Sequence, residues 1–262
     1  MSTKPGQAQK HRLDEKAAHA TVRQELAILG RMLNLAVRAG KLANRPPLPL
    51  VEVRNTRTGF FTTEQLRAVT AALPEHLRPL VQFASITGWR RAECLGLMWN
   101  RVDFGHGQVR LEPGTTKNLA GRMWPFGEHP ALASVLMEQY EKTQRLQRER
   151  GVVIPWVFHR DGKKITDFRD AWMTACKKAG VPGRLFHDLR RTAVRNLIRA
   201  GVSDKIAMAL GGWKTRSVLD RYNIVSASDL TDGVKRLVTA TPQLHSTPST
   251  ASAQSEQARK SK

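Results

Sequence analysis

Apolar residues recur at helical spacing in the first part of the chain and define one long amphipathic helix. The helix is predicted over Thr21–Ala39, and its apolar positions lie three or four residues apart: Val22, Leu26, Leu29, Leu33 and Val37. Thr21 and Gln24 predict a capping box at its start, and Gly40 fits a left-handed residue just beyond its end. The proline-rich stretch Arg45–Pro49 cannot continue a helix, so we expect a stiff linker and a domain boundary there.

The pattern in the rest of the chain changes from helical to strand-like and back to helical. A capping box at Thr62 and Gln65 predicts the first helix of this region. Short alternating segments at 104–112 and 123–126 predict two or three antiparallel strands. Helices are predicted on both sides of the strands, at about 62–73, 79–85, 90–97, 130–150, 168–179, 187–200, 203–210 and 226–238. This order predicts an α+β fold that is mainly α, in which helices surround a small antiparallel sheet.

The chain is strongly basic. It contains 43 Lys and Arg residues against 22 Asp and Glu, which gives a formal charge of +21 and an isoelectric point near 11.0. Basic side chains displace counterions from nucleic acid, so this excess favours a nucleic-acid partner; a ribosomal or membrane-surface protein is the alternative. No stretch approaches the roughly 18 apolar residues of a membrane span, and the polar start of the chain lacks the apolar core of a signal peptide. We therefore expect no membrane partner and a cytoplasmic or nucleoid location.

The spacing of cysteine and histidine residues predicts neither a disulfide framework nor a metal site. The chain has two cysteines, Cys94 and Cys176, which are far apart and lack CxxC spacing. Its eight histidines show neither HxxxH nor HxH spacing. Both thiols are expected to be reduced and buried in the core, and the chemistry is expected to need no metal and no cofactor.

Two pairs of polar residues lie one helical turn apart and project from the same face of their predicted helices. Arg90 follows a Thr-Gly turn and shares a helical face with Glu93, although a surface ion pair is the alternative for such a pair. His187 and Arg190 also lie one helical turn apart, although a capping or surface residue is the alternative for such a histidine.

A third group combines a tryptophan and a tyrosine with several basic residues. Trp213 precedes Tyr222 by nine residues, and the segment between them carries three cations. A phenol with a pKa of about 10 deprotonates more easily than a serine hydroxyl and is a better leaving group. The other tyrosine, Tyr140, lies in a helix without such neighbours and is expected to be a half-exposed packing residue.

Together these groups resemble the tyrosine recombinases, the phage integrase family. The resemblance runs from Phe60 to Leu237, and three motifs carry it in the family's order: TGWRRAECLGLMWNRVD at 87–103, FHDLRRTAVRNLIRAG at 186–201 and LGGWKTRSVLDRYNIV at 210–225. It implies the tyrosine-recombinase catalytic fold and a site-specific recombinase that cleaves and religates duplex DNA through a 3′-phosphotyrosine. It also implies that neither ATP nor a metal is needed, because the phosphotyrosine ester conserves the bond energy.

The resemblance implies roles for individual residues. Arg90 and Arg190 match the two arginines that clamp the scissile phosphate, and Tyr222 matches the nucleophile. His187 matches the general base and acid. Lys117, in a turn between two predicted strands, matches the lysine that acts as general acid.

Three further assignments leave alternatives open. Lys163 and Lys164, in another turn, are rivals of Lys117 for the general acid. Trp213 stands where most family members carry a second histidine, but a minority has tryptophan there, whose indole N–H can donate to the phosphate. Glu93 is expected either to orient a catalytic arginine or histidine or to be a plain structural partner.

The N-terminal part departs from the family pattern, in which a complete helical core-binding domain precedes the catalytic domain. One convincing helix precedes the linker here. We expect a partial core-binding segment at 1–50, a linker at 51–59, a catalytic domain at 60–238 and a disordered tail at 239–262. A truncated integrase of phage or mobile-element origin would keep the cleavage chemistry but bind its site weakly.

The expected partners are DNA attachment sites and further copies of the chain, arranged as a tetramer during synapsis. In the resembling family a terminal helix docks on the neighbouring copy, which is the role expected for 226–238; packing within its own chain is the alternative. An accessory DNA-bending or directionality protein is a further candidate partner. Two other functions stay open: a degenerate integrase that only binds DNA, favoured by the helix-turn-helix-like pattern of 187–211, and an enzyme similar to a type IB topoisomerase.

Overall fold

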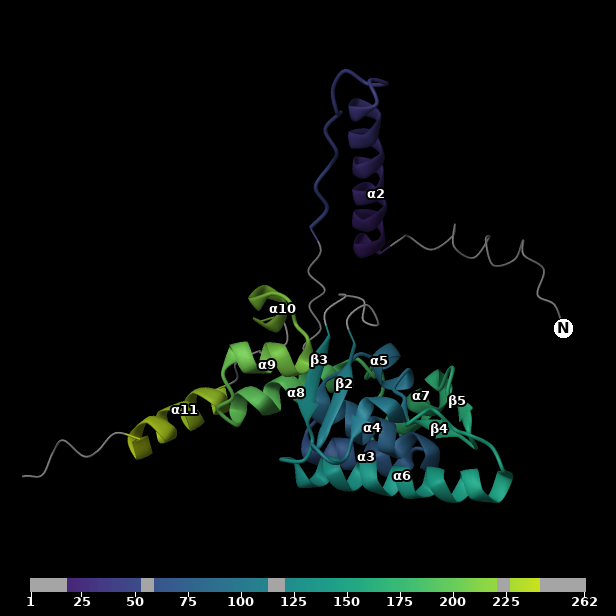
Figure 1. Ribbon diagram of the computed structural model, residues 1–262. Coiled ribbons are helices and arrows are strands. Elements are labelled where there is room, and N and C mark those ends of the chain that lie inside the picture. Colours follow the sequence, from purple (N-terminus) through teal and green to yellow (C-terminus); the bar gives the residue numbers. More distant parts are fainter. Residues whose placement is uncertain (1–17, 53–58, 113–120, 221–226, 241–262) are drawn as a thin grey trace, which may run out of the picture. The chain divides into compact units, whose positions relative to one another are not determined.

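The computed structural model describes residues 18–52, 59–112, 121–220 and 227–240 (Figure 1). The chain forms two compact units, Met1–Arg57 and Thr58–Lys262. The finer domain limits given above stay predictions. No helix in the described ranges combines the length and the apolar character that crossing a bilayer requires.

The first unit contains one long helix, which begins earlier than its sequence pattern predicts. Helix α2 spans His19–Arg38, and Ala18 is its N-cap without a side-chain hydrogen bond. The capping box predicted at Thr21 and Gln24 is therefore wrong, because the alanine-rich residues before it favour helix and extend it toward the N-terminus. Gly40 has the predicted left-handed backbone, with a φ of 67°.

Within the described residues of the first unit, one face of α2 is covered. The chain after the helix lies against Gly30, where Arg45 and Leu48 leave little room for a larger side chain. Several large apolar side chains of the same helix are exposed: Ile28, Leu29, Met32 and Leu35. An apolar face of this kind is the surface by which a helix packs against further helices.

The second unit is mainly helical with two small antiparallel sheets, as predicted for this fold class. Its described helices are α3 (Thr63–Ala72), η1 (Glu75–Leu77), α4 (Arg78–Thr87), α5 (Arg91–Leu95), η2 (Trp99–Arg101), α6 (Pro130–Arg150), α7 (Arg169–Lys178), α8 (Asp188–Arg199), α9 (Asp204–Gly211), α10 (Arg216–Asp220) and α11 (Ala227–Ala240). The capping box predicted for α3 is confirmed, because Thr62 and Gln65 each accept a hydrogen bond from the backbone N–H of the other. Helix α10 was not predicted, since five residues are too few to show a helical period.

The predicted antiparallel strands are present as a three-stranded sheet. Its strands, in the order β1-β2-β3, are β1 (Val102–Asp103), β2 (Gln108–Leu111) and β3 (Arg122–Pro125). Val109 faces Trp124 across the β2–β3 pair, and Leu111 faces Arg122. The turn with the rival lysines is part of a second hairpin, formed by β4 (His159–Arg160) and β5 (Lys163–Lys164). The strand pairing fixes β3 as one wall of the site described below.

The core of the second unit lies where α4 packs against α6 and α8. Phe83 on α4 is buried between Trp89 and Phe158, and its ring centroid lies 5.3 Å from each of theirs. Burial of one such side chain stabilises the fold by about 1.5–3 kcal/mol. Helix α6 lies beside α4 (Figure 1). This packing fixes the C-terminal end of α4, and the turn that follows it carries Arg90.

Candidate active site

Arg90 is positioned by the turn that ends α4. Gly88 closes this helix with a left-handed φ of 65°, and a Cβ at this position would lie 2.9 Å from the Cβ of Ala193 on α8. Both the backbone angle and the close approach require glycine. Trp89 is then buried in the core, and Arg90 is the N-cap of α5. The turn therefore brings Arg90 beside the first half of α8.

Glu93 holds both the backbone and the side chain of Arg90. Arg90 Nη1 donates to Glu93 Oε1 at 2.9 Å, and the Arg90 backbone N–H donates to Glu93 Oε2 at an N–O distance of 2.8 Å. The Glu93 side chain is 4% exposed and that of Arg90 is 27% exposed. A surface ion pair, the alternative considered above, does not describe this contact. The buried carboxylate leaves Arg90 anchored at one side and open to solvent at the other.

Arg190 is buried at the point where two helices end. Its Nη1 donates to the carbonyl oxygens of Gly88 and Gly211, the latter at 2.7 Å, and its Nη2 donates to the carbonyl oxygen of Gly212 at 3.4 Å. These carbonyls lie at the C-terminal ends of α4 and α9, where the helix dipoles place partial negative charge. The guanidinium also lies over the ring of Trp213, 4.2 Å from its centroid. These contacts fix the orientation of a buried positive charge.

Trp213 is folded back under Arg190 by two glycines. Gly212 ends α9 with a left-handed φ of 71°, and a Cβ at Gly211 would lie 1.8 Å from the Trp213 ring. The Trp213 side chain is buried, and its ring packs with Val194 of α8 and Leu219 of α10. The indole thus joins α8 to α10, the helix after which the predicted nucleophile follows in the sequence.

His187 is the N-cap of α8 and is exposed to solvent. Together with Trp89 and Arg190 it lines a cavity of about 390 Å³. Desolvation lowers the pKa of His187 below its ordinary value, and the positive charges of Arg190 and Arg191 lower it further. The neutral imidazole, which can accept a proton, is therefore favoured at neutral pH.

Arg122 also belongs to the site, although it was not among the predicted site residues. It is the first residue of β3, its side chain is 6% exposed, and it forms an ion pair with Glu93. Its guanidinium lies 5.1 Å from the ring centroid of Trp89. The sequence contains one signal for it, because strand alternation puts Arg122 on the same inward face as the apolar Trp124 and Phe126.

Comparison with known proteins identifies the family. Residues 60–228, well over half of the chain, match the model of the phage integrase family. The chain belongs to the phage integrase family. This confirms the resemblance carried by the three sequence motifs, together with the fold class that it implied.

The integrase region is similar to curated integrases and recombinases. The chain is 26% identical over 236 residues to an integrase of Salmonella phage P22, covering 84% of this chain and 58% of the relative. It is 26% identical over 219 residues to a shufflon-specific DNA recombinase of Escherichia coli, covering 80% of this chain and 52% of the relative. The chain thus spans a little over half the length of each of these relatives.

Solved structures show the same fold. A lambda integrase dimer bound to a COC′ core site matches with a TM-score of 0.60 and 20% identity, covering 79% of this chain and 59% of that one. The integrase of the transposon Tn1549, in complex with circular intermediate DNA, matches with a TM-score of 0.61 and 16% identity, covering 83% and 79%. At these identities the likeness shows the fold alone, which is the tyrosine-recombinase catalytic fold.

Two residues predicted from the integrase resemblance, Lys117 and Tyr222, lie outside the described residues. Lys117 falls between β2 and β3 in the sequence, as the predicted strand turn requires, and Tyr222 follows Asp220, the end of α10, by two residues. The rival lysines form β5, where Lys164 Nζ lies 4.4 Å from the ring centroid of Trp156. Of the predicted site residues, the structure therefore describes the two arginines, the histidine, the tryptophan and the buried glutamate.

Residues predicted to lie away from the site pack in the interior of the integrase domain. Cys94 and Cys176 are free and buried, which confirms them as core thiols. Burial raises the pKa of both thiols, that of Cys176 to about 11. Tyr140 is half-buried, with its ring centroid 5.1 Å from those of Trp99 and Phe104, as expected for a packing residue. In the described part of the chain, no group of three or more His, Cys, Asp or Glu side chains is placed to hold a metal ion.

Proposed function

We propose that this member of the integrase family cleaves and rejoins duplex DNA at specific sites through a covalent bond between Tyr222 and a backbone phosphate. The observation that carries the proposal is the meeting of three distant segments at Arg190. This guanidinium binds the carbonyl of Gly88, two residues before Arg90, and covers the ring of Trp213, nine residues before Tyr222. A phosphate-binding pair of arginines is thus assembled next to the segment that carries the nucleophile.

Arg90 and Arg190 are the proposed clamp on the scissile phosphate. Attack on a phosphodiester builds negative charge on the two non-bridging oxygens, and guanidinium groups stabilise this charge by bidentate hydrogen bonds. Glu93 orients Arg90, and helix-terminal carbonyls orient Arg190, before any substrate arrives. Because both groups are held in advance, little reorganisation energy is required as the charge develops.

Two transesterifications account for cleavage and rejoining. The Tyr222 phenol oxygen attacks phosphorus, the bond from phosphorus to the 5′ oxygen breaks, and a 3′-phosphotyrosine and a free 5′-hydroxyl result. His187 takes the phenolic proton in this scheme, and Lys117 protonates the departing 5′ oxygen. A 5′-hydroxyl of the same or another strand then attacks the phosphotyrosine by the reverse path. One ester replaces another in each step, so the reaction balances without ATP.

Duplex DNA carrying an attachment site is the proposed substrate. The formal charge of +21 favours a polyanion, and the two solved structures named above are a lambda integrase bound to a COC′ core site and a transposon integrase in complex with circular intermediate DNA. We expect the protein to act in the cytoplasm at the nucleoid. An accessory DNA-bending or directionality protein remains a candidate partner.

A nicked suicide duplex tests the proposed function. The protein is incubated with a pool of nicked duplexes that carry a randomised half-site, so that loss of a short strand traps any covalent product. We expect an adduct that survives SDS, with the nucleotide attached to the tryptic peptide Tyr222–Lys235. A shifted band on native gels without any adduct would favour a protein that only binds DNA. Relaxation of supercoiled DNA without a partner site would favour a topoisomerase.

The pH dependence of cleavage is expected to follow the lowered pKa of His187. A base is active in its neutral form, so the acid limb of kcat/KM, which reports the free enzyme, should have its midpoint below 6.5. NMR titration of the free protein measures the same pKa directly, and His187→Gln assigns the signal among the eight histidines. A His187 pKa of 6.5 or above would contradict the expected effect of its cationic surroundings.

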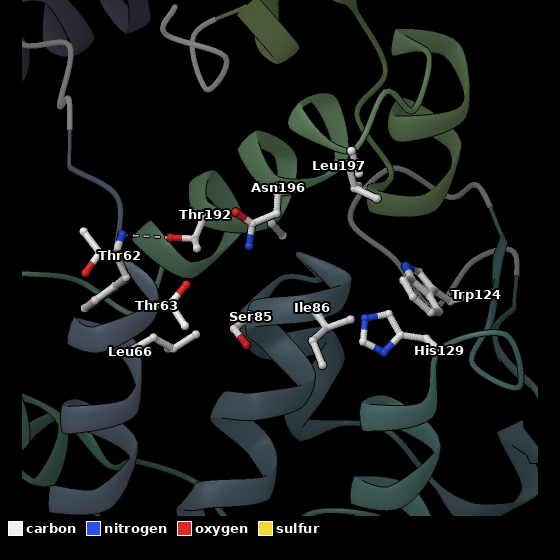
Figure 2. Close-up of a pocket in the computed structure, with 13 residues that line it drawn as sticks. Thr62, Thr63, Leu66, Ser85, Ile86, Trp124, His129, Thr192, Asn196 and Leu197 are labelled. Carbon is white, nitrogen blue, oxygen red and sulfur yellow. Dashed lines mark hydrogen bonds between the residues drawn. The ribbon is translucent and has the colours of Figure 1, made fainter. Parts of the chain in front are cut away.

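Self-association through α11 is the proposed route to higher assemblies on DNA. Three apolar side chains of this helix, Leu230, Val234 and Leu237, lie at helical spacing and are 62–65% exposed. A cavity of about 410 Å³ opens between α3, α4 and α8, with mainly apolar walls (Figure 2). One matching structure is a lambda integrase tetramer bound to a Holliday junction. We propose that α11 of one copy occupies this cavity in a second copy.

Variants of both proposed contact surfaces test the assembly. Leu230→Asp with Val234→Asp removes the apolar stripe, and Asn196→Trp fills the cavity from an exposed position. Each is expected to lower the tetramer fraction on DNA at least about tenfold, as measured by light scattering, because an apolar anchor is lost. A mixture of the two proteins should form dimers, since one intact contact remains. Equal loss in the control Thr231→Asp with Lys235→Asp would contradict the proposed contact.

A further inference from the structure

We propose that Arg122 is a positioning residue for DNA cleavage, which acts through Glu93 to hold Arg90 in place for the scissile phosphate. The inference rests on the proposed function and extends it to a residue outside the three sequence motifs. Arg122 is in the strand β3, whereas the other described site residues lie in helices or at their ends. Its side chain is nonetheless directed into the site rather than toward solvent.

The contacts of Arg122 are those of a buried ion that is held in one orientation. Its Nη2 donates to Glu93 Oε2, and the Arg122 and Glu93 side chains are 6% and 4% exposed. The guanidinium also lies over the ring of Trp89. Burial lowers the pKa of Arg122, and the charge of Glu93 offsets part of that effect. The ion pair with Glu93 is therefore what compensates the burial of this charge.

One carboxylate serves two arginines. Glu93 Oε1 accepts from Arg90 Nη1, whereas Glu93 Oε2 accepts from the Arg90 backbone N–H and from Arg122. The cluster of two guanidinium groups and one carboxylate keeps one net positive charge. Because Arg90 is the more exposed of the two arginines, the uncompensated charge is available on its side of the cluster. Without Arg122, the whole charge of Glu93 would fall on Arg90, and the carboxylate would have one anchor fewer.

Arg122 also joins the elements that carry other proposed site residues. It begins β3 directly after the segment that contains Lys117, and Leu111 of β2 is its strand partner. At its other side it fills the space above Gly212, where a Cβ would lie 1.7 Å from Arg122 Nη1. The residue after Gly212 is Trp213, which lies under Arg190. A single side chain thus ties the hairpin, the start of α5 and the end of α9 to one another.

If Arg122 had a purely structural role, its removal would lower the stability of the fold alone. If it positions Arg90, its removal also lowers the rate of the cleavage step. Arg122 is buried beneath Glu93, so its removal should change the affinity for DNA little. A misplacement of a reacting group by about 1 Å can cost about 100-fold in rate. The expected signature is therefore a loss of single-turnover cleavage rate at saturating protein, with DNA affinity and fold retained.

The test compares Arg122→Met, Arg122→Lys and Glu93→Gln in single-turnover cleavage of the suicide duplex. We expect Arg122→Met to cleave about 100-fold more slowly than wild type, with a DNA Kd within about threefold. Arg122→Lys keeps the charge without the fork geometry, so it should recover at least about tenfold of that loss. Because Arg122 and Glu93 act as one unit, the double variant Arg122→Met with Glu93→Gln should be no slower than the slower single variant.

Arg110→Met is the matched control, because it removes an exposed arginine from β2 of the same sheet. Circular dichroism gives the folded fraction of each variant, by which its rate is corrected. The proposal is overturned if Arg122→Met, once corrected, cleaves within about threefold of wild type, or if the double variant shows additive losses. It is also overturned if Arg122→Lys recovers nothing. If wild type itself forms no adduct, it is the proposed function that fails.

Discussion

Tyr222→Phe is expected to abolish the SDS-resistant adduct with the nicked suicide duplex. The substitution removes the phenolic oxygen that would form the ester with phosphorus, and no other atom of the ring can replace it. Loss of a nucleophile lowers turnover by several orders of magnitude, so we expect a decrease of at least about 1,000-fold. The adduct is measured by gel electrophoresis after denaturation. Binding of the intact duplex, measured by a mobility shift, should stay within about twofold, because the proposed phosphate ligands are unchanged.

Tyr140→Phe is the control for Tyr222→Phe, since the chain contains two tyrosines. Its ring contacts with Trp99 and Phe104 do not need the hydroxyl group, so both the adduct and the fold should be retained. An adduct that persists in Tyr222→Phe would place the nucleophile elsewhere. Loss of the adduct in Tyr140→Phe with the fold intact would have the same meaning.

The sequence predicts the start of a helix where neighbouring residues alone decide it. It does not predict the start where two nearby segments both favour an end or a continuation of the helix. Thr62 and Gln65 form the predicted capping box because both partners are local. Thr21 and Gln24 show the same pattern, but the residues before Thr21 favour helix as well, and the helix begins at His19. Local capping signals therefore identify a helix more reliably than they fix its first residue.

The site shows the same division. Arg90 and Arg190 could be found because their motifs contain regularly spaced side chains. The groups that orient Arg190 could not be found from the sequence. They are the backbone carbonyls of Gly88 and Gly211, and every residue type carries a backbone carbonyl. Only the fold shows which helix ends meet. The glycines themselves were a signal, since glycine allows the close approach that such contacts need.

Arg122 could have been found from the sequence by combining two rules. Strand alternation puts it on the buried face with Trp124 and Phe126, and a buried arginine requires a carboxylate or carbonyl partner. The acidic residue that pairs with it, Glu93, lies 29 positions earlier on a helix. The two rules together predict that a partner exists, but the identity of the partner depends on how β3 packs against α5. Sequence spacing holds no information about that packing.

Arg190→Lys is expected to lower the cleavage rate about 100- to 1,000-fold, because one fixed donor to the developing charge is worth that much. The guanidinium binds helix-terminal carbonyls while its plane lies over Trp213, and a lysine ammonium is a compact point charge that cannot reproduce this planar set of contacts. The positive charge is kept, so the loss should appear in the single-turnover rate more than in DNA affinity.

Arg199→Lys, at the exposed end of the same helix, is the matched control for Arg190→Lys and should cleave at close to the wild-type rate. Thermal unfolding of both variants separates the two roles of Arg190, since its carbonyl contacts also join the ends of α4 and α9. A lower Tm with an unchanged rate for the folded fraction would mean that Arg190 only stabilises this junction. A lower cleavage rate of fully folded Arg190→Lys, which higher concentrations of protein or DNA do not restore, would mean that the phosphate requires the orientation of the guanidinium.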